Sequence, residues 1–318
     1  MVGQAGEEVL WEPSPQLMES CRLADYAAWL GREAAGPSPT SYSELWQWSV
    51  SDPGAFWRSL VAYFGVAEPP PSEATPQGDM PFAKWFPGTA LNYAEQALRH
   101  ADPQREVVVG YSETGARRTL TGTELSGQAA SLAAWLAERG VGPGDRVAGY
   151  LPNIPQAVVA CLATASLGAV WSSCSPDFGE QAVLDRLEQI EPAILFAADG
   201  YRYGGRAYDR RPLTRSLAAR LSSVRQVVAV PVLEPDAAPW LERAVAWKET
   251  VSASCAPRFE QVAFDHPLWI LYSSGTTGLP KPIVHGHGGM VLEHLKALAL
   301  HADIGPSSRF FWFTTTGW

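Results

Sequence analysis

The sequence predicts an α/β fold with a doubly wound, mainly parallel sheet, preceded by a helical N-terminal region. Between residues 106 and 273, short apolar runs alternate with stretches of helical spacing, which is typical of βαβ units. Before them, residues 1 to about 66 carry tryptophan and aliphatic side chains at helical spacing. The chain has 318 residues, of which 46% are hydrophobic, and this is enough for a large buried core.

The helical region is followed by a proline-rich stretch. Ser51 or Asp52 is a candidate N-cap with Pro53 at the first helical position, so a helix is expected to begin here. The stretch EPPPSEATPQGDMP, residues 68–81, is rich in proline and small polar residues. Such a composition predicts a linker or a wrapping loop.

The α/β part begins with a predicted hairpin, in which EVVVGY at 106–111 pairs with RRTL at 117–120. Thr121 and Glu124 form a capping box before an amphipathic helix, and Gly140 is suited to its C-terminal end. Further helices are expected at 156–167 and 181–190. Strands are expected within 143–151, 169–173, 193–198, 225–233, 267–274 and 310–315.

Charge and cysteine content exclude several classes of protein. The formal net charge is -9 and no run of Lys or Arg stands out, so neither nucleic acid nor membrane insertion is expected. The cysteines, Cys21, Cys161, Cys174 and Cys255, are far apart and form no CxxC pair. Reduced thiols in a cytoplasmic protein are therefore expected, and the N-terminus has no signal-peptide pattern.

The segment with the clearest chemistry is LWILYSSGTTGLPKPIVHGHGG, residues 268–289. A buried strand is followed by small and hydroxylated residues, whose backbone N–H groups and hydroxyls can surround an anion. Lys281 adds a cation. This pattern predicts a site for the polyphosphate of a nucleotide, with a plain flexible connection as the alternative. The candidate residues are Ser273, Ser274, Gly275, Thr276, Thr277, Gly278 and Lys281.

This loop is not a Walker A motif, which requires Gly-Lys followed by Ser or Thr. Here Leu279 and Pro280 separate Gly278 from Lys281, and a proline follows the lysine. The sequence therefore disfavours a P-loop kinase or GTPase.

Residues flanking the loop have weaker functional signals. His285 and His287 alternate on an expected short strand, but no further ligand is close in sequence, so no metal site is expected. Core packing is the favoured role of Trp312 and Trp318, because aromatic residues on apolar strands are usually buried. The candidate substrate-pocket residues, near the end of the last expected strand, are Thr315, Thr316 and Trp318.

The stretch YSSGTTGLPK resembles the phosphate-loop signature of the adenylate-forming enzymes. Three further stretches narrow the resemblance. WFPGTALNYAEQAL at 85–98 is similar to the N-terminal region of the acetyl-CoA and acetoacetyl-CoA synthetases, and WSSCSPDFGEQAVLDRLEQIEP at 171–192 and FFWFTTTGW at 310–318 resemble the acetoacetyl-CoA synthetase group of that superfamily. The resemblance implies ATP-dependent activation of acetoacetate through an acyl-adenylate to acetoacetyl-CoA, with ATP, Mg²⁺ and CoA as required small molecules. The loop at 273–281 would then hold the leaving pyrophosphate.

The resemblance also implies a division of the chain and a missing part. Residues 1–84 correspond to the helical N-terminal region with its linker, and residues 85–318 to part of an AMP-binding domain. The adenine motif, the hinge and the adenylation lysine of the family have no counterpart in this sequence, so no catalytic residue is assigned. We therefore expect that the chain alone does not complete the ligase reaction. The alternatives are a ligase for another short acid, such as acetate or propionate, and a shortened non-catalytic nucleotide-binding protein.

Overall fold

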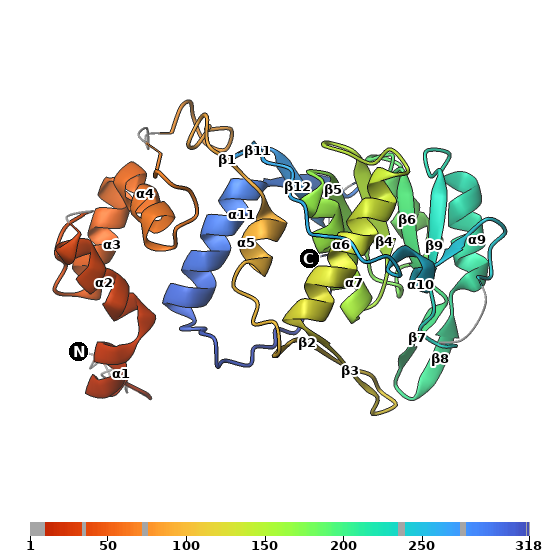
Figure 1. The fold of residues 1–318 in the computed structure, drawn as a ribbon, viewed down its shortest axis with the longest axis horizontal. Helices are drawn as coiled ribbons and strands as arrows, with labels where there is room; N and C mark the ends of the chain where they lie inside the picture. Colours follow the sequence, from red (N-terminus) through yellow and green to blue (C-terminus); the bar gives the residue numbers. More distant parts are fainter. Residues whose placement is uncertain are drawn as a thin grey trace, which may run out of the picture. The chain divides into compact units, whose positions relative to one another are not determined.

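The computed structural model describes residues 10–33, 36–71, 76–234, 239–273, 278–315 and 317. The chain forms two compact units. The first contains the described residues up to Phe86 together with Leu292–Phe311, and the second contains Pro87–Val291 together with the described part of 312–318. Figure 1 shows the elements of both units along the chain.

The first unit is helical, as predicted. Its elements are α1 (Pro15–Ser20), α2 (Arg22–Arg32), α3 (Tyr42–Ser51), α4 (Pro53–Tyr63) and a π-helical turn, η1 (Leu295–His301). Asp52 is the N-cap of α4, because its carboxylate accepts the Ala55 N–H at 2.9 Å, and Pro53 begins the helix. At the core, the fully buried Tyr26 hydroxyl lies 2.6 Å from Ser59 Oγ.

The second unit is built on a seven-stranded sheet in the order β10-β9-β6-β4-β5-β12-β13. Every neighbouring pair is parallel except β12 with β13. The sheet strands are β4 (Arg146–Tyr150), β5 (Val170–Cys174), β6 (Ile194–Ala198), β9 (Gln226–Val230), β10 (Val245–Ala246), β12 (Pro267–Ser273) and β13 (Lys281–Gly286). The sequence-based prediction of a mainly parallel sheet is confirmed.

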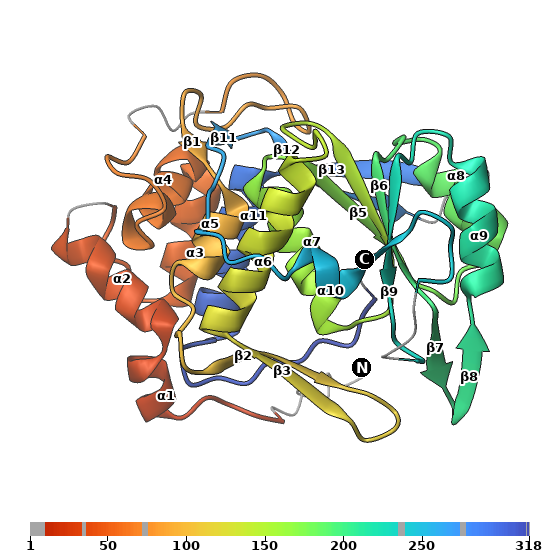
Figure 2. The same cartoon turned by 45° about the vertical axis from the view of Figure 1, so that its right-hand side comes forward.

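Three two-stranded pairs accompany the sheet. The strands are β1 (Ala90–Leu91) with β11 (Val262–Ala263), β2 (Glu106–Tyr111) with β3 (Arg117–Thr121), and β7 (Gly200–Tyr203) with β8 (Arg206–Asp209). The predicted hairpin at 106–120 is therefore confirmed. Figures 1 and 2 show the β2–β3 and β7–β8 hairpins projecting toward the same end of this unit.

Helices cover both faces of the sheet (Figure 2). They are α5 (Tyr93–Leu98), α6 (Gly122–Ala137), α7 (Pro155–Ser166) and α10 (Trp247–Thr250) on one face, and α8 (Glu180–Leu187) and α9 (Arg211–Arg220) on the other. The helix α11 (His287–His294) follows β13. Successive strand side chains enter opposite cores, so that Phe196 packs with α6 and α7 whereas Leu195 packs with α8 and α9. This two-sided burial explains why the strands appear in the sequence as continuous apolar runs.

The connections from the neighbouring parallel strands β4 and β6 lead toward opposite edges of the sheet. The connection from β4 runs through α7 to β5, whereas the connection from β6 runs through α9 to β9 on the other side. Adjacent strands whose connections diverge in this way leave a crevice at their carboxyl ends, where α/β proteins bind ligands. The topology therefore marks the loops after β4 and β6 as a binding region.

One predicted strand is wrong. Residues 310–315 have no regular secondary structure, and no strand in the described part of the chain pairs with them. Trp312 was expected to pack in a core, yet 72% of its surface is exposed, and Phe311 and Phe313 are exposed as well. An apolar run becomes a strand only where a neighbouring strand satisfies its backbone, and the described residues offer this segment no such strand.

The capping box is confirmed, since Thr121 and Glu124 bond each other's backbone N–H at the start of α6. The four cysteines are all free, and burial raises the pKa of both Cys161 and Cys174 to about 12. Among the described residues, no helix has the length and apolar character that crossing a bilayer requires.

Candidate nucleotide-binding site

The predicted phosphate loop is the turn of the hairpin formed by β12 and β13. Ser273, the last residue of β12, is paired with Lys281, the first residue of β13. Because β12 runs parallel to β5, the loop lies at the same edge as the carboxyl ends of the other parallel strands. Ser274, Gly275, Thr276 and Thr277 lie outside the described residues.

The described end of the loop has two properties that suit a phosphate site. Gly278 has a φ of +130°, a conformation that residues with a side chain rarely adopt. Lys281 is exposed and forms no ion pair with any residue that the structure describes. Its ammonium group is therefore available to a bound anion.

The last turn of α8 and the residues directly after it are hydrogen-bonded to β12 and to the residue before β13. The Tyr272 hydroxyl donates to the Arg186 carbonyl at 2.8 Å, and Gln189 Nε2 donates to the Pro280 carbonyl at 3.0 Å. These bonds fix the two ends of the loop relative to the sheet. No sequence signal pointed to Gln189, because its partner lies 91 residues away.

The candidate substrate residue Thr315 lies near the same edge. Its neighbour Thr314 accepts a hydrogen bond from Asn153 Nδ2, at 2.6 Å, in the loop after β4. A Cβ at Gly317 would lie 2.9 Å from the Ser173 carbonyl oxygen in β5. The segment therefore runs from the end of β4 toward the end of β5, with the half-buried Thr315 between them. Thr316 and Trp318 lie outside the described residues.

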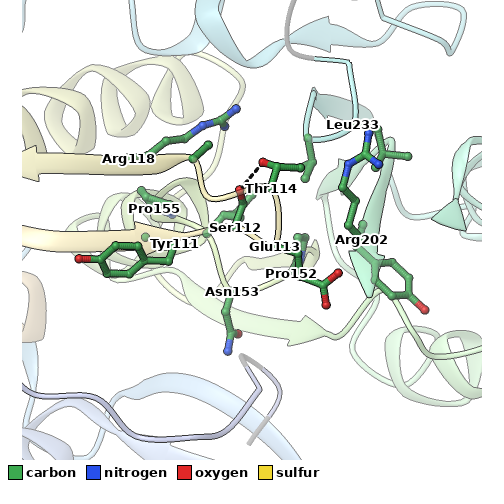
Figure 3. Close-up of a pocket in the computed structure, with 15 residues that line it drawn as sticks. Tyr111, Ser112, Glu113, Thr114, Arg118, Pro152, Asn153, Pro155, Arg202 and Leu233 are labelled. Carbon is green, nitrogen blue, oxygen red and sulfur yellow. Dashed lines mark hydrogen bonds between the residues drawn. The ribbon is translucent and has the colours of Figure 1, made fainter. Parts of the chain in front are cut away.

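A cavity of about 370 Å³ lies at the crevice that the sheet topology places between β4 and β6, and we call it the switch-point cavity (Figure 3). Its wall is formed by the turn between β2 and β3, residues 152–155 after β4, the start of β7, and residues 232 and 233 after β9. Arg118 and Arg202 line it and form no ion pair within the described ranges. Cationic groups beside an apolar wall suit a ligand that carries both negative charge and a ring or apolar part.

Asp199 supports one wall of this cavity. It is buried at the end of β6, and its carboxylate accepts N–H groups from Val232, Leu233 and Glu234 at 2.7–3.2 Å. This carboxylate therefore determines the path of the chain after β9. The sequence held a signal for it, namely an acidic residue directly after the buried run AILFAA.

The two candidate histidines differ in their surroundings. His285 lies on β13 and is half-buried, and this burial lowers its pKa. His287, the first residue of α11, is fully buried and accepts the Tyr93 N–H at Nδ1, at 3.1 Å. Burial and the neighbouring His266 lower the pKa of His287 to about 4. No group of three potential metal ligands occurs anywhere in the described ranges.

The buried His287 is expected to make stability depend on pH. Its folded pKa of about 4 lies below the ordinary histidine pKa of 6.5, so the unfolded chain binds more protons between these values. His287 is thus expected to lower the free energy of unfolding by about 2 kcal/mol as the pH falls from about 7.5 to about 5. Urea denaturation of the wild type and of His287→Gln measures this. A pH dependence that is the same in both would contradict it, and His100→Gln, at an exposed histidine, is the control.

Comparison with known proteins agrees with this geometry. Residues 94–318 match the family model described as AMP-binding enzyme. The chain belongs to the AMP-binding enzyme family. Residues 42–97 match a second family model, described as acetyl-coenzyme A synthetase N-terminus.

Relatives that are named for an enzymatic activity are similar along nearly the whole chain. The chain is 39% identical over 315 residues to acetoacetyl-coenzyme A synthetase of Rhizobium meliloti (strain 1021), covering 98% of this chain and 48% of the relative. It is 34% identical to the malonamoyl-CoA synthetase of Penicillium aethiopicum, covering 98% of this chain and 45% of that protein. The solved structure of acetoacetyl-CoA synthetase from Streptomyces lividans superposes with a TM-score of 0.93 at 48% identity, covering 98% of this chain and 48% of that one. The chain thus spans about half the length of these relatives.

Proposed function

We propose that the protein containing this chain is an acetoacetate–CoA ligase, which converts acetoacetate, ATP and CoA into acetoacetyl-CoA, AMP and pyrophosphate. The similarity to the Streptomyces lividans acetoacetyl-CoA synthetase, at 48% identity and a TM-score of 0.93, carries this proposal. The position of the phosphate loop supports it, because Ser273 and Lys281 close that loop at the edge where α/β sheets bind ligands.

The proposed chemistry has two steps. A carboxylate oxygen of acetoacetate bonds to the α-phosphorus of ATP and pyrophosphate leaves, giving the acyl-adenylate. The CoA thiol then bonds to the acyl carbon and AMP leaves, while the thiol proton passes to solvent. In the first step, Lys281 and the backbone of the loop would hold the pyrophosphate portion and reduce the charge repulsion that the attacking carboxylate meets.

Magnesium is proposed to arrive with the nucleotide. The described residues contain no cluster of carboxylates and histidines that could hold the ion on its own. Mg²⁺ usually keeps several waters and binds through substrate phosphates together with one or two carboxylates. When bound, the ion would share the negative charge of the phosphates beside Lys281.

The proposal also assigns the residues of the acyl site. Thr315, Thr316 and Trp318 would line the acyl site, which the position of Thr315 between the ends of β4 and β5 supports.

We place the boundary between the helical region and the AMP-binding domain at residues 84 and 85. In support, the compact units change at Phe86 and the two family models meet near residues 94–97. A cytoplasmic location is supported by the four free cysteines.

A different acid is the second candidate. The malonamoyl-CoA synthetase relative favours it, because malonamate and acetoacetate share a carbonyl at the third carbon and differ only in an amino or methyl group. The match to the acetyl-coenzyme A synthetase N-terminus keeps acetate and propionate as further alternatives.

Product analysis of the complete protein tests the proposed function. The protein is incubated with ATP, Mg²⁺ and CoA and with each acid in turn, and the acyl-CoA and AMP formed are measured by mass spectrometry. We expect acetoacetate to give the highest kcat/KM. A higher value with malonamate, acetate or propionate would replace acetoacetate with that acid, and formation of ADP in place of AMP would contradict the adenylation chemistry.

A further inference from the structure

Glu113 joins two hairpins that are far apart in the sequence. It lies in the turn between β2 and β3, and its carboxylate oxygens accept the N–H groups of Gly204 and Gly205, at 2.9 and 3.0 Å. These glycines form the turn between β7 and β8. The two hydrogen bonds therefore fasten the tip of one hairpin to the tip of the other, and we call this arrangement the hairpin clamp.

The β7–β8 turn is shaped for a single anion. Gly204 and Gly205 have φ values of +60° and +75°, a left-handed conformation that glycine adopts without strain. Consecutive N–H groups in such turns can converge on one negatively charged group. Here the Glu113 carboxylate is that group, and it satisfies both donors at once.

The β7–β8 hairpin depends on contacts outside itself. Each of its strands has four residues, and neither pairs with another strand in the described part of the chain. Isolated two-stranded hairpins are marginally stable at best in water. Stacking of Tyr201 on Tyr208, at 5.0 Å between ring centroids, joins the strands to each other but does not fix the hairpin in place.

The clamp lies on the wall of the switch-point cavity. Glu113 and Thr114 line the cavity from one hairpin, and Tyr201 and Arg202 line it from the other (Figure 3). A movement of the β7–β8 hairpin away from Glu113 would open this wall and displace the Arg202 guanidinium.

We infer that Glu113 is a positioning residue, whose carboxylate holds the β7–β8 hairpin, and with it Arg202, in place at the switch-point cavity. The inference rests on the proposed function in one respect. It requires that a phosphate-bearing co-substrate of the reaction, ATP or CoA, occupies this cavity. The clamp itself is a property of the fold and can be tested without any ligand.

Hydrogen exchange tests the clamp directly. In Glu113→Ala, the amide protons of Gly204 and Gly205 lose their acceptors and are expected to exchange about fivefold faster or more. Trypsin is expected to cleave faster after Arg202 and Arg206 for the same reason. Glu106→Gln is the matched control, because it removes an exposed ion pair with Arg117 from the same β2–β3 hairpin without touching the clamp. Equal exchange in the wild type and in Glu113→Ala would overturn the inference.

Ligand titration tests positioning against a merely structural role. ATP and CoA are titrated separately into the complete wild-type protein, Glu113→Ala and Glu106→Gln. We expect Glu113→Ala to weaken the binding of one of the two ligands by about threefold or more and to leave the other unchanged. Unchanged affinity for both, together with faster exchange at Gly204, would refute the positioning role. A wild-type protein that binds neither ligand would contradict the proposed function, and hydrogen exchange would still decide the clamp.

Discussion

Replacing Lys281 with alanine is expected to lower acetoacetate-dependent exchange of pyrophosphate into ATP by about tenfold or more in the complete protein. Lys281 closes the loop hairpin opposite Ser273, is exposed, and forms no ion pair with the residues that the structure describes. Its charge is therefore free to act on the phosphates of ATP. The loss should appear mainly in the adenylation step, because the lysine closes the loop that is proposed to hold the leaving pyrophosphate.

The design of this experiment separates charge from folding. Lys281→Arg keeps the positive charge and is expected to retain more activity than Lys281→Ala. Lys248→Ala removes an exposed lysine from α10 and serves as the control. Gly275→Val, in the part of the loop outside the described residues, is expected to act in the same direction as Lys281→Ala. Wild-type exchange rates in both loop variants would contradict the assignment of the loop.

Replacing Asp199 with asparagine is expected to lower the free energy of unfolding by about 2–4 kcal/mol. The buried carboxylate accepts N–H groups from three consecutive residues, Val232, Leu233 and Glu234. An asparagine of the same shape turns an NH₂ group toward these donors, so at least one of them loses its acceptor. Because Val232 and Leu233 line the switch-point cavity, this wall should loosen as well.

Urea denaturation of Asp199→Asn, followed by tryptophan fluorescence, measures this effect. Asp102→Asn is the matched control, since among the described residues the exposed side chain of Asp102 accepts one backbone N–H, from Gln104 at 2.9 Å. We expect the control to change stability by less than about 1 kcal/mol. Equal stabilities of Asp199→Asn and the wild type would show that the carboxylate does not hold the chain after β9.

The parallel sheet could be predicted because of how its strands are buried. Strands β4, β5 and β6 have helices on both faces, so their sequences are nearly continuous apolar runs bounded by turn residues. The phosphate loop could be predicted for a related reason, since its residues are consecutive in the chain. Local signals of this kind do not depend on the rest of the fold.

The features that could not be predicted depend on distant segments. The run FFWFTT has the composition of a strand, yet no described strand lies beside it to pair with its backbone. The switch-point cavity is assembled from several loops that come together only in the folded sheet. The partners of Glu113 lie more than ninety positions along the chain, so a surface glutamate in a hairpin turn carried no signal of its role.

The most direct test of the central claim is exchange of labelled pyrophosphate into ATP by the complete protein, with acetoacetate and Mg²⁺ present and CoA absent. If the loop between Ser273 and Lys281 serves acyl-adenylate formation, exchange should depend on acetoacetate, should need no CoA, and should fall by about tenfold or more in Lys281→Ala. Exchange that requires CoA, or that is the same with and without acetoacetate, would contradict the account.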